Sequence, residues 1–157
     1  MNILRYFIFL LYLIIAIRVN AADVEISGTQ ATREDLQDSS TLTISGTLDG
    51  DLNNIVRGYI AAGNEIDNAT VVVDSGGTIQ GQSNAIMGRE TDSLTVINSG
   101  TIEATSSKAI QLRDSQNATI TNKSGGTIFA NTNAIVQQSA GTEDAENTTI
   151  TNAGTIY

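Results

Sequence analysis

The sequence predicts an all-β fold, a parallel β-helix of about four coils with three short strands in each coil. Two observations predict it. A Gly-Thr-Ile or Gly-Thr-Leu phrase recurs five times, each time after a β-rich run such as "LTVIN" or "TTITN". A second aliphatic phrase, "NAI" or its variants "NNI" and "KAI", follows each of the first four copies. The phrase glycines are Gly46, Gly77, Gly100, Gly126 and Gly154.

The period of the repeat suits a solenoid. Successive phrase glycines are 31, 23, 26 and 28 residues apart. A unit of this length with three short strands cannot bury an apolar face alone, whereas stacked copies can. Like strands of successive coils then lie about 4.8 Å apart. The Asn-Gly hairpin signal of a β-sandwich, the alternative fold, does not occur, and no segment after residue 22 keeps a helical period.

Stacking in register predicts three interior ladders of aliphatic side chains, with one residue from each coil in each ladder. Burial of one such side chain stabilises a fold by roughly 1.5–3 kcal/mol, so we expect stability to depend on several coils. The first ladder is Leu48, Ile79, Ile102, Ile128 and Ile156; the second is Ile55, Ile86, Ile110 and Ile135; the third is Val72, Val96, Ile120 and Ile150.

For the corner before each phrase, the sequence predicts the backbone conformation of the glycine and the role of the polar residue that precedes it. We expect the phrase glycines to adopt positive φ there, a conformation that glycine reaches without steric cost. A polar residue precedes four of these corners, and stacked amide side chains can hydrogen-bond along a coil axis. These residues predict a structural polar ladder of Asp74, Asn98, Asn122 and Asn152.

The first 21 residues have the form of a secretory signal peptide. Arg5 gives a positive start, and an unbroken apolar run of 12 residues covers 6–17. This run is short for a transmembrane helix, which needs roughly 20 residues, although an uncleaved anchor remains the alternative. We predict cleavage between Ala21 and Ala22. Residues 22–40 are then an N-terminal cap, and residues 41–157 are β-helix repeats that end on an incomplete coil.

Composition excludes several classes of function. The net charge of −9, which becomes −11 when Arg5 and Arg18 leave with the signal peptide, disfavours nucleic acid because phosphate binding needs clustered bases. Without Cys the chain has neither disulfides nor thiolate metal sites. Without His it has no Ser-His or Cys-His catalysis. The carboxylates fall mostly in predicted corner loops rather than as pairs on a strand face, which polysaccharide hydrolysis would need.

Two weak motifs are best explained by the repeat itself. Asp49, Asp51 and Asn53 have the alternate spacing of calcium ligands, but the glycine and glutamate of an EF-hand loop do not follow. An Asn- and Thr-rich repeat also produces glycosylation-type triplets by chance. We therefore expect no catalytic residue, no metal ligand and no cofactor. The triplets begin at Asn68, Asn117, Asn122 and Asn147.

Outward threonine pairs raise one further possibility. Residues two apart share a strand face, and a flat threonine ladder is how some β-helical proteins bind ice. Thr119/Thr121 and Thr149/Thr151 would form such pairs. We expect the array to be interrupted, because other coils place Thr95/Ile97 and Val71/Val73 there.

By these features the sequence resembles an autotransporter passenger, a class of Gram-negative surface protein exported by type V secretion. The resemblance covers about Thr41–Tyr157 and lies in the Cys-free, acidic, Asn/Thr/Gly-rich composition and units such as "LTVINSGTIEATSSKAIQL". It implies a right-handed parallel β-helix, export through the inner membrane by the general secretion machinery, and an outer-membrane β-barrel transporter as partner. This chain contains no barrel, so the resemblance implies a periplasmic location if a barrel is truly absent and otherwise the cell surface or medium.

We therefore expect a non-catalytic passenger segment that acts as an adhesin, stalk or scaffold, with a host-surface or cell–cell ligand as a further possible partner. The alternative is a fragment of a secreted β-helical polysaccharide-active enzyme, a lyase or hydrolase. Length variation collects at one corner of the predicted coil, in Val56–Asn68 and Val136–Asn147. Insertions in solenoids often mark the contact face, so these loops are the predicted contact region.

Overall fold

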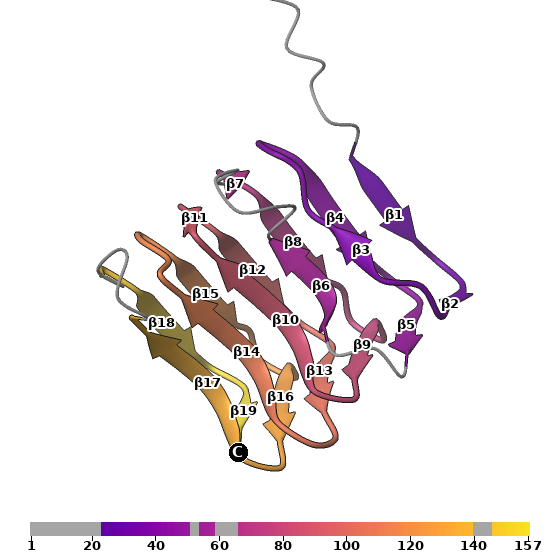
Figure 1. Cartoon of the computed structure of the whole chain (residues 1–157). Helices are drawn as coiled ribbons and strands as arrows, with labels where there is room; N and C mark the ends of the chain where they lie inside the picture. The colour runs from indigo at the N-terminus through magenta and orange to yellow at the C-terminus, as the bar shows by residue number, and fades with distance from the viewer. Residues whose placement is uncertain (1–22, 51–53, 59–65, 140–145) are drawn as a thin grey trace, which may run out of the picture.

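The computed structural model describes residues 23–50, 54–58, 66–139 and 146–157, which form an all-β parallel solenoid of about four turns (Figure 1). The strands stack into three parallel sheets, which gives each coil three sides. The predicted signal peptide and its cleavage site at Ala21 and Ala22 lie outside the described residues.

The three sheets run the length of the stack, and neighbouring strands are parallel throughout. Sheet A contains β1 (Val24–Ile26), β4 (Thr41–Ile44), β8 (Thr70–Val73), β12 (Thr95–Asn98), β15 (Thr119–Asn122) and β18 (Thr149–Asn152). Sheet B contains β2 (Thr29–Gln30), β5 (Thr47–Gly50), β9 (Thr78–Gly81), β13 (Thr101–Ala104), β16 (Thr127–Ala130) and β19 (Thr155–Ile156). Sheet C contains β3 (Glu34–Asp35), β6 (Asn54–Gly58), β10 (Asn84–Arg89), β14 (Lys108–Arg113) and β17 (Asn133–Gln138).

A fourth, two-stranded sheet of β7 (Ile66–Asp67) and β11 (Thr91–Asp92) lies at the corner between sheets C and A. Isolated bridges join Asp92 to Gln116 and Gln116 to Glu146, so later coils continue this corner with less regular pairing. The segment 22–40, predicted to be a cap, contributes β1, β2 and β3 from residue 24 onward. It therefore ends the stack and also forms a short first coil.

The strands of sheets A and B alternate between partly exposed and buried residues, because successive side chains point to opposite faces. In β13, Ile102 and Ala104 are buried whereas Thr101 and Glu103 lie on the outer face. Threonine and β-branched aliphatic residues both favour strands. The recurring Thr-Ile pair thus supplies one outward and one inward side chain.

The first interior ladder is in register in every coil. Each residue of this ladder pairs directly with its equivalent in the next coil. The first four side chains are 0% exposed, whereas the last lies on the final coil and is partly buried. The ladder is Leu48, Ile79, Ile102, Ile128 and Ile156.

The second ladder differs from the prediction at one residue. Ile86 pairs with Ile110, and Ile110 pairs with Ile135, as expected, but Ile86 faces Val56 rather than Ile55 on the preceding coil. Gly50 pairs with Gly81 and Asn54 with Asn84, so this coil carries one more residue at the corner between β5 and β6. Ile55 is still fully buried, one residue before the ladder.

The third ladder is also displaced by one residue in one coil. Val96 pairs with Val71, and Val72 faces outward beside Ile97. The prediction that Val72 points inward is therefore wrong by one residue, because alternate side chains of a strand point to opposite faces and Val71 occupies the inward position. Ile120 is fully buried, whereas Ile150 on the last coil is 49% exposed.

The phrase glycines serve a different purpose from the predicted one. Positive φ occurs at Gly76 and Gly125 among the described glycines, not at the phrase glycines. A Cβ atom on any phrase glycine would lie well under 3.0 Å from the nearest atom, which in most of these coils is a backbone oxygen of the preceding coil. Glycine is therefore required there for close approach of the chain, a second established use of this residue.

Candidate functional site

A ladder of three asparagines, joined by side-chain hydrogen bonds, lies at the ends of the last three strands of sheet A. Asn98 donates from Nδ2 to Oδ1 of Asn122 across 2.8 Å, and Asn122 donates from Nδ2 to Oδ1 of Asn152 across 2.8 Å. Asn98 and Asn122 are 0% exposed. Buried amides need such partners because an unsatisfied polar group is costly in the interior.

Backbone contacts define the direction of this ladder. The backbone N–H of Gly100 donates to Oδ1 of Asn98 across 3.2 Å, and that of Gly154 donates to Oδ1 of Asn152 across 3.1 Å. A backbone N–H can only donate, so the oxygen of each amide must face it. Every Nδ2 group in the ladder therefore points toward the C-terminal end of the stack.

Asp74 was predicted to belong to this ladder, but Val73 pairs with Asn98 in its place. Asp74 is exposed and begins a four-residue turn in which the backbone N–H of Gly77 donates to its carbonyl across 2.9 Å. Gly76 has a φ of 91° at the third position of the turn, as a type II turn requires. Asp74 therefore corresponds to Lys123, which begins the same kind of turn after β15, and Val73 takes the place of the ladder asparagine.

Threonine columns run along the outer faces of sheets A and B. In sheet B the column passes through every coil in register, and in sheet A it passes through five coils. The sheet B column is Thr29, Thr47, Thr78, Thr101, Thr127 and Thr155, and the sheet A column is Thr41, Thr70, Thr95, Thr119 and Thr149.

The second outward column of sheet A is interrupted, as the sequence predicts, by the predicted Ile97 and by Val72 in place of the predicted Val71 and Val73. Val72 and Ile97 occupy it between Thr43 and Thr121. Val71 and Val73, which were expected to point outward here, are fully buried. The outer face of sheet A therefore combines one complete threonine column with one mixed column.

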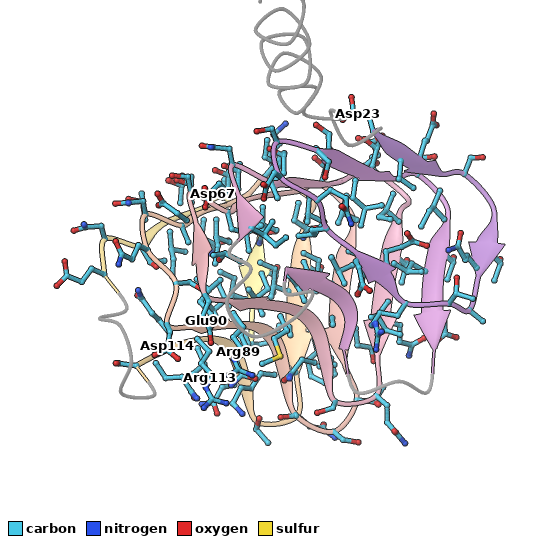
Figure 2. The ribbon with its side chains drawn as sticks, turned by 45° about the horizontal axis from the view of Figure 1, so that its top comes forward. Asp23, Asp67, Arg89, Glu90, Arg113 and Asp114 are labelled. Carbon is cyan, nitrogen blue, oxygen red and sulfur yellow. The ribbon has the colours of Figure 1, made fainter. Side chains whose placement is uncertain are left out.

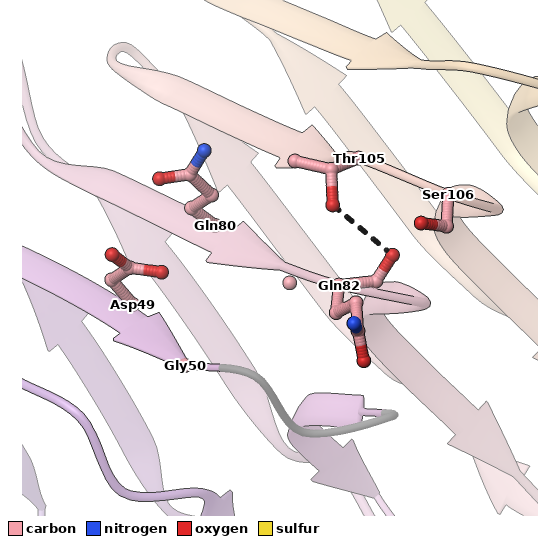
Figure 3. Close-up of a pocket in the computed structure, with 7 residues that line it drawn as sticks. Asp49, Gly50, Gln80, Gln82, Thr105 and Ser106 are labelled. Carbon is pink, nitrogen blue, oxygen red and sulfur yellow. Dashed lines mark hydrogen bonds between the residues drawn. The ribbon is translucent and has the colours of Figure 1, made fainter.

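A polar groove of about 320 Å³ lies where sheet B turns toward sheet C (Figure 3). It is lined by side chains and backbone of three successive coils, and Oγ1 of Thr105 donates to the carbonyl of Gln82 across 3.3 Å at its edge. Asp49 is the one carboxylate among the lining residues that the structure describes. The lining residues are Asp49, Gly50, Gln80, Gly81, Gln82, Thr105 and Ser106.

The described side chains of this groove are hydrogen-bonding groups. Glycosidases use two carboxyl groups roughly 5–10 Å apart, and the described lining contains one. Of the three residues with the alternate spacing of calcium ligands, Asp49 lines this groove, and Asp51 and Asn53 lie outside the described residues. No group of three or more acidic or other metal-binding side chains occurs in the described parts of the chain.

Three of the asparagines that begin glycosylation-type triplets lie at the corner between sheets C and A, where the backbone adopts a left-handed conformation. Asn68, Asn117 and Asn147 have φ values of 55°, 52° and 58°, and Ser39 and Ser93 adopt the same conformation at this corner in two other coils. Asparagine tolerates this left-handed region better than most residues. The backbone N–H of Asn68 donates to the carbonyl of Asp92 across 2.9 Å, which ties this corner to the next coil. The fourth triplet residue belongs to the asparagine ladder.

A charged cluster lies at the end of β10 and β14 (Figure 2). Arg89 and Arg113 pair in register on adjacent strands, which places two positive charges side by side. Nε of Arg89 lies 3.1 Å from Oε1 of Glu90, and Nε of Arg113 lies 3.7 Å from Oδ2 of Asp114. The carboxylates compensate the guanidinium charges, so we assign no anion site to this cluster.

The middle parts of the two loops predicted to contact a partner, residues 59–65 of Val56–Asn68 and 140–145 of Val136–Asn147, lie outside the described residues. Among the described residues there is no helix with the length and apolarity that a membrane crossing demands.

The comparisons with protein families, curated proteins and solved structures found no match to this chain.

Proposed function

We propose that this chain is a non-enzymatic segment of an exported surface or secreted protein, a rigid β-solenoid stalk that presents its outer faces to a partner. The proposal joins the signal-peptide pattern of residues 1–21 to the solenoid fold and to the resemblance with autotransporter passengers. In this scheme the general secretion machinery moves the chain across the inner membrane, and a separate or fused outer-membrane transporter moves it to the surface.

The observation that carries the proposal is the closely packed interior. The first three complete coils bury aliphatic side chains from all three sheets, the fourth buries them from sheets A and B with Ile135 of sheet C partly buried, and the core cluster continues from Ile26 to Ala130 without a break between coils. A filled interior leaves the outer faces and corners for recognition. Their repeated threonine hydroxyls offer the same hydrogen-bonding group on each coil, an arrangement suited to weak contacts that gain strength by repetition.

The polar groove supports the stalk over the enzyme alternative. A retaining or inverting glycosidase needs an acid and a second carboxylate across the scissile bond, whereas Asp49 stands alone among the described lining residues. A groove of this kind can hold a hydroxyl-rich ligand by hydrogen bonds from its Gln, Thr and Ser side chains without any reaction.

Export tests the first half of this proposal. The full chain with a C-terminal epitope tag would be expressed in a Gram-negative host, and the mass of the protein in each cell fraction would be measured. We expect a product that begins at Ala22 outside the cytoplasm. A matched Leu11→Arg variant, which places a charge within the apolar run, should remain uncleaved in the cytoplasm. Cytoplasmic retention of the unchanged chain would refute export.

A polysaccharide-cleavage assay tests the second half. The purified protein would be incubated with acidic and neutral polysaccharides, and new reducing ends would be counted. We expect none above background, and no change with Asp49→Asn. Cleavage that disappears in Asp49→Asn would show that the groove is an active site and that the stalk interpretation is wrong.

A further inference from the structure

A second column of outward side chains runs along sheet B beside its threonine column. Tyr157 lies opposite Phe129, because its N–H donates to the carbonyl of Ile128 and its carbonyl accepts from the N–H of Ala130. The side chains of the column change from polar to aromatic along the stack. Strand register places one residue from each of five coils in this column, in the order Asp49, Gln80, Glu103, Phe129 and Tyr157.

The aromatic end of this column is a pair of rings in contact. The ring centroids of Phe129 and Tyr157 lie 5.0 Å apart, with the ring planes inclined by 46°. Both rings lie on a side of the solenoid, whereas any further coil would stack along its axis, so this side is not the end of the stack. After residue 22 the chain has three aromatic residues, and two of them form this pair outside the core. Apolar surface gathered on an outer face is typical of a binding site.

The polar end of the column coincides with the groove at the edge of sheet B. Asp49 and Gln80 lie on neighbouring strands and line the groove (Figure 3). Glu103 pairs with Gln80 on one side and with Phe129 on the other. The groove and the aromatic pair are therefore two ends of one strip, called here the sheet B strip. With strands about 4.8 Å apart, the strip is about 19 Å long.

The chemistry of the sheet B strip matches a sugar chain. A hexose has an apolar C–H face that packs against an aromatic ring, and hydroxyl groups around its edge that donate to carboxylate and amide oxygens. Binding sites for small ligands combine apolar and aromatic surface with a few polar groups in the same way. The spacing of about 4.8 Å between coils is comparable to the length of one hexose in an extended chain, so successive coils can meet successive sugars.

The charge of the strip restricts the kind of sugar. Its five side chains include two carboxylates and no basic group, and the whole chain has a net charge of −9. Acidic polysaccharides would be repelled by these charges. A peptide that adds a strand is also disfavoured, because the backbone groups of β9, β13 and β16 already pair with neighbouring coils and such a ligand needs a free sheet edge.

We propose that the sheet B strip binds a neutral, unbranched oligosaccharide. One sugar packs against the rings of Phe129 and Tyr157, and the hydroxyl groups of the following sugars donate to Glu103, Gln80 and Asp49. Hydrogen bonds to the two carboxylates are stronger than those between neutral groups. This inference rests on the proposed function, in which the outer faces of the solenoid contact a partner, and it names the face and the chemical class of ligand.

Calorimetric titration of the full chain tests the proposal. The probes are neutral tetrasaccharides of β-1,4-linked glucose, β-1,4-linked mannose and α-1,4-linked glucose, with a tetrasaccharide of galacturonic acid as the acidic comparison. We expect saturable binding of at least one neutral tetrasaccharide and weaker binding of the acidic one. The corresponding free hexose should bind at least about tenfold more weakly, because it spans one coil and loses the remaining contacts.

Variants of the strip separate binding from folding. Phe129→Leu keeps an apolar side chain but removes the ring, and should weaken binding at least about tenfold, whereas Phe129→Tyr should bind as the unchanged protein does. Glu103→Ala should weaken binding by about threefold to tenfold, the effect of one lost hydrogen bond. The matched controls on the outer face of sheet A, Ile97→Ala and Glu25→Ala, should leave affinity unchanged. Circular dichroism would confirm that each variant is folded.

The outcomes distinguish this inference from the proposed function. Absence of binding to every neutral tetrasaccharide, equal affinity of Phe129→Leu, or tighter binding of the acidic tetrasaccharide would each overturn the sugar site and leave the stalk function standing. Binding followed by the appearance of new reducing ends would uphold the site and refute the non-enzymatic function. Binding without cleavage, weakened by Phe129→Leu and Glu103→Ala alone, would support both.

Discussion

Asn98 and Asn122 lie on adjacent coils and are joined by a 2.8 Å hydrogen bond from Nδ2 of the first to Oδ1 of the second. Nδ2 of Asn98 also lies 3.0 Å from the carbonyl of Thr127, and Nδ2 of Asn122 lies 3.1 Å from that of Thr155. Each amide thus links sheet A of its own coil to sheet B of the next. The ladder holds the corner together as well as the strands.

Asn122→Ala should therefore destabilise the protein more than Asn152→Ala. Asn122 is fully buried and bonded on both sides, whereas Asn152 is exposed at the end of the ladder. We expect a loss of about 1–3 kcal/mol for the first, since it leaves buried groups unpaired, and under about 1 kcal/mol for the second. Urea unfolding followed by circular dichroism measures both. Equal losses would argue against a structural role for the buried amides.

Gly100→Ala should be among the most damaging single substitutions in the chain. The new Cβ would collide with backbone oxygens of Gly77 and Asp74, which cannot move without opening the coil. We expect a loss of several kcal/mol or failure to fold, as for other backbone clashes. Gly28→Ala is the control, because nothing lies within 4 Å of its added Cβ. Thermal unfolding would separate the two, and similar midpoints would contradict the close-approach explanation.

Substitution of valine by threonine at two neighbouring positions tests the register of β8. Val71→Thr places a hydroxyl in the core, where Val71 is 0% exposed, and should cost about 1–3 kcal/mol. Val72→Thr places it on the outer face beside Ile97 and should change the free energy of unfolding by less than about 0.5 kcal/mol. The two variants are isosteric with the original residue, so cavity effects cancel. The reverse order of stability would restore the register predicted from sequence.

Asn68 tests the left-handed corner between sheets C and A. With φ at 55°, Asn68→Val should lose about 1–2 kcal/mol, because a branched Cβ crowds the carbonyl in this conformation. Asn68→Gly should be neutral or slightly stabilising, since glycine adopts positive φ freely. Thr70→Val, on the outer face of the adjacent strand, is the matched control for the added branched side chain. Chemical denaturation would check the series, and a stable Asn68→Val protein would refute conformational strain at this corner.

Much of the fold follows from the repeated phrase. The Gly-Thr-Ile copies predict parallel stacking, and the ladder from Leu48 to Ile156 lies in register in every coil. The position and lining of the polar groove could not be predicted from the sequence. The polar groove joins residues of three coils that are far apart in the chain, and although Asp49 and Gln80 each follow a copy of the repeated phrase, the side chain at this position differs from copy to copy. The sheet B threonine column contains the threonine of every copy of the phrase, and the strand register shows that these threonines are aligned.

By itself, the sequence determined the all-β class, the inward and outward sides of most strands, and the need for glycine at each corner. Those properties depend on local alternation and on a short repeated phrase. The tertiary structure decided which residue of each coil joins each ladder. Val56 rather than Ile55 takes its place because the corner before β6 is one residue longer, and pairing with β12 places Val71 rather than Val72 and Val73 rather than Asp74. A shift of one residue reverses the face of a strand, and only pairing with the neighbouring coils resolves it.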